Sequence, residues 1–221
     1  MYLAAMHSRI ATPRMHLVAL TADELDELLA GARVVAGVAI PSSWPKAQPG
    51  EVDILRYFSG QLRAEPSLLE WQFRLMADRE SAAMLGHCGF HDPPKSGALE
   101  IGYTVLEPHR RQGYATEAIL ALMDQAADEH DIHRFRLAIS PTNLPSTSLA
   151  MRLGFDRVGE QIDREDGIEL LYERQWPPTA PSPPGDLAPT GALPTRHAYE
   201  PHPWVGGRSA AGRIAPDRRG T

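Results

Sequence analysis

The chain has 221 residues and a formal net charge of −6, and 43% of its residues are hydrophobic. This length predicts one globular domain with additional segments, and the acidic balance argues against nucleic acid or an anionic membrane as the main partner. The single cysteine, Cys88, excludes an internal disulfide and favours the reducing cytoplasm. The longest apolar run, residues 34–40, is far too short to span a membrane.

Composition divides the chain into three segments. Residues 1–14 lack the long apolar stretch of a signal peptide, so we interpret them as a loose N-terminal extension. Residues 15–176 carry periodic apolar patterns and are the expected folded domain. Residues 177–221 contain ten of the twenty prolines and few large apolar side chains, so this segment is expected to be disordered.

The first half of the domain predicts strands and two amphipathic helices. Thr21 can cap a helix over residues 22–31, because Glu24 completes a capping box. Residues 52–64 carry apolar side chains at helical spacing and predict a second helix. The strands are expected at residues 16–20, 68–76 and 83–91, with a proline-rich loop at 40–50 and a turn at 92–97.

The second half alternates strands with helices. A strand is expected over residues 99–106, where apolar side chains alternate with polar or small ones. A polar loop then leads into a helix whose apolar face begins at Ala115. The remaining elements are a strand at 134–139, a helix at 143–153 and a strand pair at 157–161 and 168–173. The pattern predicts an α+β fold, with a mixed sheet covered by helices on both faces in three αβα layers.

The loop before this helix has the chemistry of an anion-binding site. The first turn of a helix presents backbone N–H groups without partners and a partial positive charge. Gly113 and Ala115 lack bulk, so a phosphate can approach the backbone there. Arg110 and Arg111 can add charge-assisted hydrogen bonds. A surface turn with solvated arginines is the alternative interpretation.

Two motifs at the right separation resemble the GNAT superfamily of N-acetyltransferases, in particular its RimJ/RimL-like branch. The acetyl-CoA signature of that family is matched by Arg110, Gly113 and Ala115. A second series, Asn143, Ser146, Leu149 and Gly154-Phe155, follows downstream. The resemblance covers roughly residues 15–176 and implies a mostly antiparallel sheet that opens like a V beside a bulged fourth strand, where acetyl-CoA enters.

The resemblance also implies where acetyl-CoA lies. Residues along the fourth strand should contact the pantetheine arm, and the following loop should hold the pyrophosphate. Asn143 and Ser146 should reach the cofactor near the thioester and the pantetheine arm. The implied cofactor-binding residues of the strand and loop are Thr104, Val105, Leu106, Arg110, Arg111, Gln112, Gly113, Tyr114, Ala115 and Thr116. A backbone N–H near Val105 or Leu106 could stabilise the oxyanion of the tetrahedral intermediate.

The chain departs from the better-known branch of the family at two positions. The glutamate that acts there as the base corresponds to Ala138, and the tyrosine that protonates the thiolate corresponds to Ala150. That acid–base pair therefore cannot be carried over. Its absence leaves two readings open: an active N-acetyltransferase that acylates a primary amine of a small molecule, peptide or protein, and a catalytically inactive acyl-CoA-binding module or sensor.

Glu100 is the predicted catalytic base. If His91 lies opposite Ala98, Glu100 faces Gly89 and is diagonal to His87 and His91 on the same face of the sheet. A carboxylate between two imidazoles could take a proton through water. The alternative interpretation is a polar cluster without a chemical role.

No metal site is expected from His87, Cys88 and His91, because on a strand Cys88 points away from both histidines. The expected partners are acetyl-CoA and an amine acceptor, and the sequence leaves open whether the chain forms a homodimer.

Overall fold

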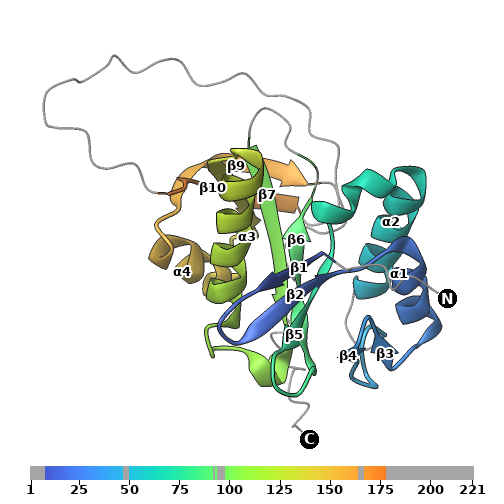
Figure 1. Cartoon of the computed structure of the whole chain (residues 1–221). Helices are drawn as coiled ribbons and strands as arrows, with labels where there is room; N and C mark the ends of the chain where they lie inside the picture. Colours follow the sequence, from blue (N-terminus) through green and yellow to red (C-terminus); the bar gives the residue numbers. More distant parts are fainter. Residues whose placement is uncertain (1–7, 47–49, 92, 94–97, 164–166, 178–221) are drawn as a thin grey trace, which may run out of the picture.

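The computed structural model describes residues 8–46, 50–91, 93, 98–163 and 167–177 (Figure 1). The elements in chain order are β1 (Arg9–Ala11), β2 (Met15–Ala19), α1 (Ala22–Ala30), β3 (Val34–Val35), β4 (Val38–Ala39), α2 (Glu51–Ala64), the 3-10 helix η1 (Pro66–Glu70), β5 (Arg74–Asp78), β6 (Met84–Phe90), β7 (Ala98–Val105), the 3-10 helix η2 (Glu107–His109), α3 (Tyr114–His130), β8 (Arg134–Ile139), α4 (Leu144–Arg152), β9 (Asp156–Asp163) and β10 (Gly167–Gln175).

An eight-stranded sheet in the order β1-β2-β5-β6-β7-β8-β10-β9 forms the middle layer. Every neighbouring pair is antiparallel except β7 and β8, which run parallel. The α+β fold and its mixed, mostly antiparallel sheet are therefore as the sequence predicted. The small hairpin of β3 and β4 forms a separate sheet beside it.

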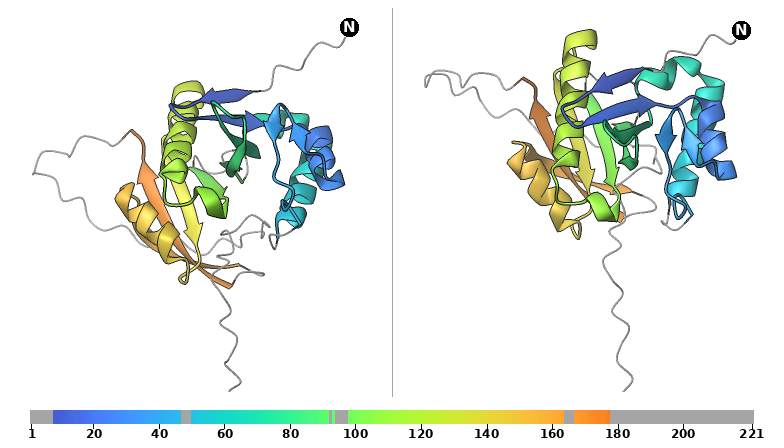
Figure 2. Two further views of the ribbon diagram at one scale, coloured as in Figure 1. Left: turned by 90° about the horizontal axis from the view of Figure 1, so that it is seen from below. Right: turned by 60° about the horizontal axis from the view of Figure 1, so that its bottom comes forward.

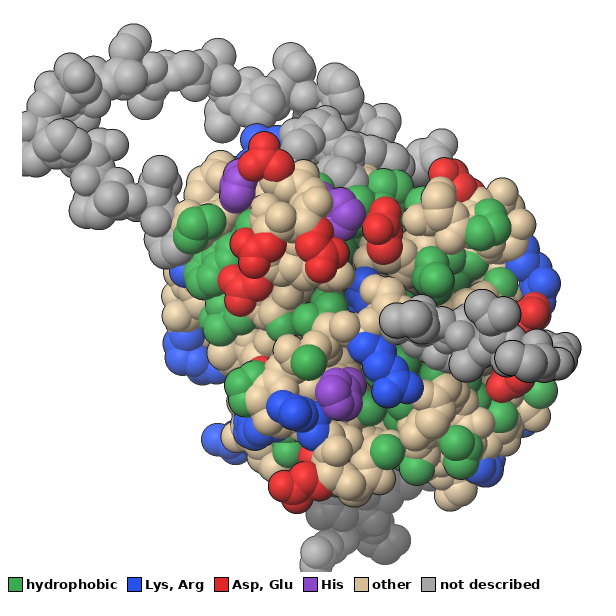
Figure 3. All heavy atoms as spheres, viewed as in Figure 1, with side chains coloured by type: hydrophobic (Ala, Val, Ile, Leu, Met, Phe, Trp, Pro, Cys, Tyr) green, Lys and Arg blue, Asp and Glu red, His purple; other side chains and the backbone are tan. Residues whose placement is uncertain are grey.

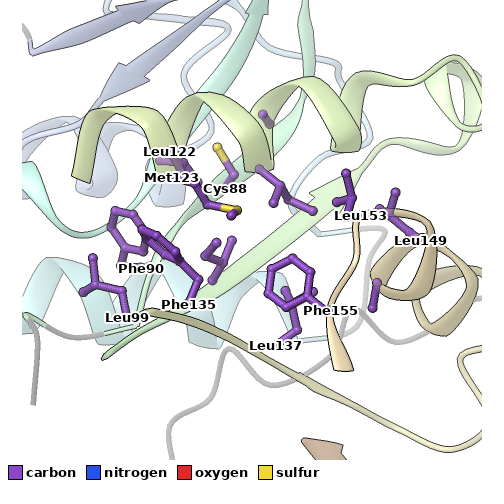
Figure 4. Close-up of a cluster of buried hydrophobic side chains, with 14 of the residues drawn as sticks. Cys88, Phe90, Leu99, Leu122, Met123, Phe135, Leu137, Leu149, Leu153 and Phe155 are labelled. Atoms are coloured by element: carbon purple, nitrogen blue, oxygen red, sulfur yellow. The ribbon is translucent and has the colours of Figure 1, made fainter. Parts of the chain in front are cut away.

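Helices cover both faces of the sheet, and two hydrophobic cores lie beneath them (Figure 2). Under α3 and α4, side chains such as Leu122, Phe135, Leu149 and Phe155 point toward one another (Figure 4). Under α1 and α2 a second core contains Leu25, Phe58 and Phe73 among its members. The capping box at Thr21 and Glu24 is present at the start of α1, as predicted.

The sheet opens between its two parallel strands. Strand β7 pairs with β8 only from Ala98↔Arg134 to Glu100↔Arg136, although β7 continues to Val105. The last five residues of β7 therefore have an edge that β8 does not occupy, as the resemblance implied. The implied bulge is not present in the described pairing of β7 with β6, which keeps one register from Gly86↔Val105 to Phe90↔Ile101.

Two predictions for segments of the chain differ from the structure, and two others fall mostly outside the described residues. The strand expected at 68–76 begins only at Arg74, because Pro66 starts a 3-10 helix that buries Leu68. The expected loose extension at 1–14 contains β1, which pairs antiparallel with β2 through Ile10↔Leu17. The segment expected to be disordered, 177–221, lies outside the described residues except for its first residue, and most of the turn expected at 92–97 also lies outside them.

Candidate active site

The unpaired edge of β7 presents backbone groups toward the opening of the sheet. In the ladder with β6, Leu106 donates its N–H to Leu85 at 2.9 Å, and the N–H of His91 bonds to the Glu100 carbonyl at 3.0 Å. Because hydrogen bonding alternates along an antiparallel strand, the N–H of Val105 points away from β6, toward the opening. Leu106 therefore has no N–H to offer an oxyanion, and of the two predicted donors only Val105 remains.

The loop after β7 is held in a compact conformation by its own polar groups. Arg110 Nε donates to the Val105 carbonyl at 3.0 Å, and Gln112 Nε2 donates to the Pro108 carbonyl at 3.1 Å. Arg111 has φ 62° and Gly113 has φ 86°, so both adopt the left-handed conformation. For Arg111 this conformation is uncommon, and such residues gather at functional sites.

Gly113 is the N-cap of α3, and no side chain caps this helix. The first backbone bond of α3 runs from the Glu117 N–H to the Gly113 carbonyl at 3.1 Å. The preceding N–H groups of Tyr114, Ala115 and Thr116 therefore have no acceptor within the helix. The loop thus has the conformation of an anion-binding backbone concavity at a helix N-terminus.

The N-terminal hairpin contacts this loop. Thr12 Oγ1 lies 2.5 Å from Glu117 Oε1, and Arg14 Nε donates to Glu117 Oε2 at 2.7 Å. Arg14 Nη1 donates to the Gln112 carbonyl at 2.8 Å, and its guanidinium lies over the Tyr114 ring. We call Thr12, Arg14 and Glu117 the clasp. Figure 3 shows most Asp and Glu side chains of this face on its upper half and several Lys and Arg side chains on its lower half, although both charges occur on both halves.

The clasp sets the ionisation of Glu117. Burial alone would raise the pKa of this carboxyl, but hydrogen bonds from Thr12 and from the backbone and side chain of Arg14 hold it below its ordinary value. Glu117 is therefore ionised at neutral pH and balances the charge of Arg14. The clasp could not be predicted from the sequence, because Glu117 lies more than 100 residues from Thr12 and Arg14 and no local pattern relates them.

Glu100 lies directly beside one histidine, not diagonal to two. His91 Nδ1 is 2.9 Å from Glu100 Oε1, and both side chains are almost buried. The predicted register, with Glu100 facing Gly89, is wrong by two residues, because Gly89 pairs with Gly102. His91 therefore faces Glu100 directly, whereas His87 faces Thr104, further along the strand.

His87 belongs to a different polar group. Its Nε2 is 3.0 Å from Glu51 Oε1, and Trp44 Nε1 donates to Glu51 Oε2 at 3.2 Å. All three side chains are buried, and the His87 ring stacks on Phe73 with centroids 4.9 Å apart. No local sequence pattern indicates the contact of Glu51 with His87, because the two residues lie 36 positions apart.

Helix α4 lies across the opening from β7. Asn143 caps it, with Oδ1 accepting the Ser146 N–H at 3.2 Å. Burial raises the pKa of Tyr103, and the Ser146 hydroxyl opposes that shift. The side chains of Tyr103 on β7 and Ser146 on α4 therefore approach each other across the opening of the sheet, a proximity that the sequence did not indicate.

The remaining predicted cofactor residues follow the same path. Thr104 and Val105 are half-buried on the last part of β7, and Leu106 is buried beside them. Arg110, Arg111, Gln112 and Gly113 are exposed. The structure thus brings the predicted strand and loop residues together at one end of the opening, next to the start of α3. Their contacts with acetyl-CoA stay predictions.

Three further observations concern metal ligands, the single cysteine and membrane-spanning helices. Among the described residues, no three or more His, Cys, Asp or Glu side chains are grouped so that they could hold a metal ion. Burial raises the pKa of the Cys88 thiol to about 12, so it is not a thiolate at neutral pH. In the described part of the chain, no helix has the length and apolar character that crossing a bilayer requires.

A family model described as "Acetyltransferase (GNAT) domain" matches residues 14–156. Among curated relatives, the uncharacterized N-acetyltransferase p20 of Bacillus licheniformis is 32% identical over 96 residues, covering 43% of this chain and 54% of the relative. The ribosomal-protein-serine acetyltransferase of Escherichia coli (strain K12) is 26% identical over 114 residues, covering 51% of this chain and 62% of the relative. The chain thus matches little more than half the length of these two relatives.

Solved structures share the fold over nearly their whole length. A putative ribosomal-protein-serine acetyltransferase from Vibrio cholerae has a TM-score of 0.56 at 22% identity and covers 76% of this chain and 97% of that one. RimL, a ribosomal L7/L12 alpha-N-protein acetyltransferase solved with coenzyme A, has a TM-score of 0.55 at 18% identity and covers 76% and 98%.

Proposed function

The chain belongs to the GNAT family of N-acetyltransferases, which use acetyl-CoA, and we propose that it transfers the acetyl group of acetyl-CoA to a primary amine. The amine nitrogen forms a bond to the thioester carbon, the carbon–sulfur bond breaks, and the amine loses a proton. The products are an N-acetyl amine and coenzyme A. The acceptor is a small molecule, a peptide or a protein.

The observation that carries this proposal is the left-handed loop at the start of α3, directly after the unpaired edge of β7. In the proposal, the N–H groups of this loop and of the first turn of α3 bind the pyrophosphate. Arg110 and Arg111 add charge beside it. The pantetheine arm lies along Thr104, Val105 and Leu106 and reaches the α4 side of the opening, where Asn143 and Ser146 lie.

Two groups on β7 would carry the chemistry. The Val105 N–H, which points into the opening, would donate to the oxyanion of the tetrahedral intermediate. Glu100, on the face of the sheet opposite α3, would take the amine proton directly or through a water molecule, with His91 beside it. The missing glutamate and tyrosine at Ala138 and Ala150 leave no other carried-over acid or base.

The proposal is tested by measuring thiol release from acetyl-CoA across a panel of polyamines, amino acids, peptides and protein N-termini. We expect turnover with at least one amine class above the rate without acceptor. Binding of acetyl-CoA without turnover on any amine would support the alternative, an acyl-CoA-binding module, and would overturn the enzyme proposal.

The cofactor site is tested separately with Gly113→Glu. Acetyl-CoA should bind the wild-type chain with micromolar affinity, on the order of −8 kcal/mol. The new carboxylate should abolish this binding, because it would enter the space of the pyrophosphate and repel it. Gly113→Gln is the matched control, since it carries the same backbone strain and bulk without the charge. Calorimetry that shows unchanged binding in Gly113→Glu would refute the pyrophosphate assignment.

A further inference from the structure

The loop that precedes α3, residues 110–113, is the α3 loop. One basic side chain beside it comes from the N-terminal part of the chain. Arg14 follows β1 and lies on the short turn that leads into β2. Two of its three guanidinium nitrogens are used within the protein: Nε by Glu117 and Nη1 by the Gln112 carbonyl. Among the described residues, no hydrogen bond uses Nη2.

The unused nitrogen borders the space beside Gly113. A Cβ atom placed on Gly113 would lie 3.3 Å from Arg14 Nη2, and apart from the neighbouring residues no other described atom would lie within 4 Å of it. Arg14 Nη2 therefore lies directly beside Gly113, and the absence of a side chain at Gly113 lets an anion approach the loop next to this nitrogen. A diphosphate bound beside the loop could then accept from backbone N–H groups of the first turn of α3 and from the Arg14 guanidinium.

The side chain is fixed before any ligand arrives. The backbone N–H of Arg14 also donates to Glu117, at 2.8 Å, and the guanidinium lies 4.5 Å from the centre of the Tyr114 ring. Glu117 is in turn held by the buried Thr12. Such preorganisation reduces the ordering cost that a flexible arginine would add on binding. The planar guanidinium also suits phosphate oxygens better than a point charge does.

We propose that Arg14 is a ligand of the coenzyme A diphosphate, and that Thr12 and Glu117 are its positioning residues. This inference rests on the proposed function, because it takes the α3 loop to be the diphosphate site. It extends that site to the N-terminal hairpin, and it gives the β1–β2 turn a binding role in addition to a structural one.

A purely structural role predicts different behaviour. If Arg14 only ties the hairpin to α3, its loss lowers stability and changes cofactor affinity little. If Arg14 contacts the diphosphate, its loss weakens cofactor binding and also reduces the salt dependence of that binding, because one phosphate–cation contact disappears.

The experiment is calorimetry of acetyl-CoA binding to the full chain at low and high KCl. Arg14→Gln should weaken binding about tenfold or more at low salt, in the range expected for a hydrogen bond to a charged group, and should flatten its salt dependence. Arg14→Lys keeps the positive charge but loses the planar guanidinium and its N–H donors, so it should recover part of the lost affinity. Arg9→Gln is the matched control: it removes a charge from the same hairpin, where Arg9 donates to the Ala36 carbonyl at 3.0 Å, and should change the dissociation constant less than twofold.

The inference is overturned if Arg14→Gln binds acetyl-CoA within twofold of the wild-type chain, if Arg9→Gln weakens binding equally, or if the salt dependence is unchanged. If Arg14→Gln does not fold, Arg14→Met is used, since its stem still packs on Tyr114, and the same outcomes apply. The Gly113→Glu variant separates the two proposals. If it binds normally, the loop assignment and the Arg14 inference both fail; if it does not bind while Arg14→Gln does, only the inference fails.

Discussion

Glu100 is well placed to be a base but is not freely exposed. Its carboxylate is about one-tenth exposed and lies 2.9 Å from His91 Nδ1. It is also on the last residue of β7 that pairs with β8, so the opening of the sheet starts beside it. An amine that reached the thioester through the opening would therefore pass near this carboxylate, and a single water molecule could join the two.

Replacing Glu100 with Gln should lower kcat/KM for the amine acceptor by 10²-fold or more, consistent with typical general-base effects. The substitution keeps the shape of the side chain but removes the proton acceptor. The affinity for acetyl-CoA, measured by calorimetry, should hardly change.

Two histidine variants are controls for this prediction. His91→Gln should lower kcat/KM by less than Glu100→Gln does, because His91 contacts the carboxylate but does not take the proton. His87→Gln should leave kcat/KM nearly unchanged, since His87 is paired with Glu51 instead. A loss below about fivefold in Glu100→Gln would instead support catalysis by proximity alone, which can supply several kcal/mol.

For single residues, the sequence predicted which of them lie at the opening of the sheet but not all of the side chains that contact them. The α3 loop was predictable because its glycine, arginines and helix start are contiguous in the chain. The partners of Glu100 were predicted from an assumed turn, and the actual register differs by two residues, which moves His87 away. The contact of His87 with Glu51 spans 36 residues and has no local signal.

The hairpin of β1 and β2 joins two elements that are distant in sequence. Its turn is fixed to α3 by the clasp, and Arg79 Nη1 donates to the Thr12 carbonyl at 3.0 Å from the other side. Strand β1 was not predicted, because three residues are too few to show alternation. It exists because β2 offers a partner, which is tertiary information. The long elements α3 and β8 were predictable, since their apolar periods are clear.

The clasp predicts a specific dependence of stability on pH. The pKa of Glu117 in the folded chain lies below its ordinary value of 4.5. A depressed carboxyl pKa contributes stability that is fully present above the ordinary value and is lost as the pH falls through the folded value. The difference in unfolding free energy between the wild-type chain and Glu117→Gln should therefore be constant near neutral pH and should shrink below about pH 4.5.

Urea unfolding at a series of pH values measures this difference. Asp26 and Asp78 also have lowered pKa values. The Ser59 hydroxyl bonds to Asp26, and the backbone N–H and hydroxyl of Ser81 bond to Asp78. Their contributions cancel in the comparison, since both chains carry them. A difference that stays constant down to pH 3 would show that the clasp does not depend on ionised Glu117.

On the scale of the whole molecule, the sheet consists of two parts joined by a short seam. Among the described residues, strands β1 to β7 and strands β8 to β10 are joined by a single three-residue pairing, which ends at Glu100↔Arg136. The core under α3 and α4 also crosses this seam, because it contains Leu99 of β7 together with Phe135 of β8 (Figure 4). Beyond the seam, β7 and β8 are not paired, and the proposed cofactor path runs along this part of β7 from the α3 loop toward α4.

Acetyl-CoA should therefore stabilise the folded chain as a unit. A ligand that binds only the native state at 100 times its dissociation constant adds about 2.7 kcal/mol to the unfolding free energy. For a domain of this size, such an increase raises the melting temperature by roughly 5 to 10 °C. A thermal unfolding series with increasing acetyl-CoA should show this rise in the wild-type chain and a shift below about 1 °C in Gly113→Glu at the same concentrations, because that variant does not bind. The shift in melting temperature should also be smaller in Arg14→Gln than in Arg9→Gln. The dissociation constant of Arg14→Gln is expected to be larger, so the same concentration of acetyl-CoA stabilises it less. An equal rise in the wild-type chain and Gly113→Glu would mean that acetyl-CoA stabilises the chain from a site other than the α3 loop.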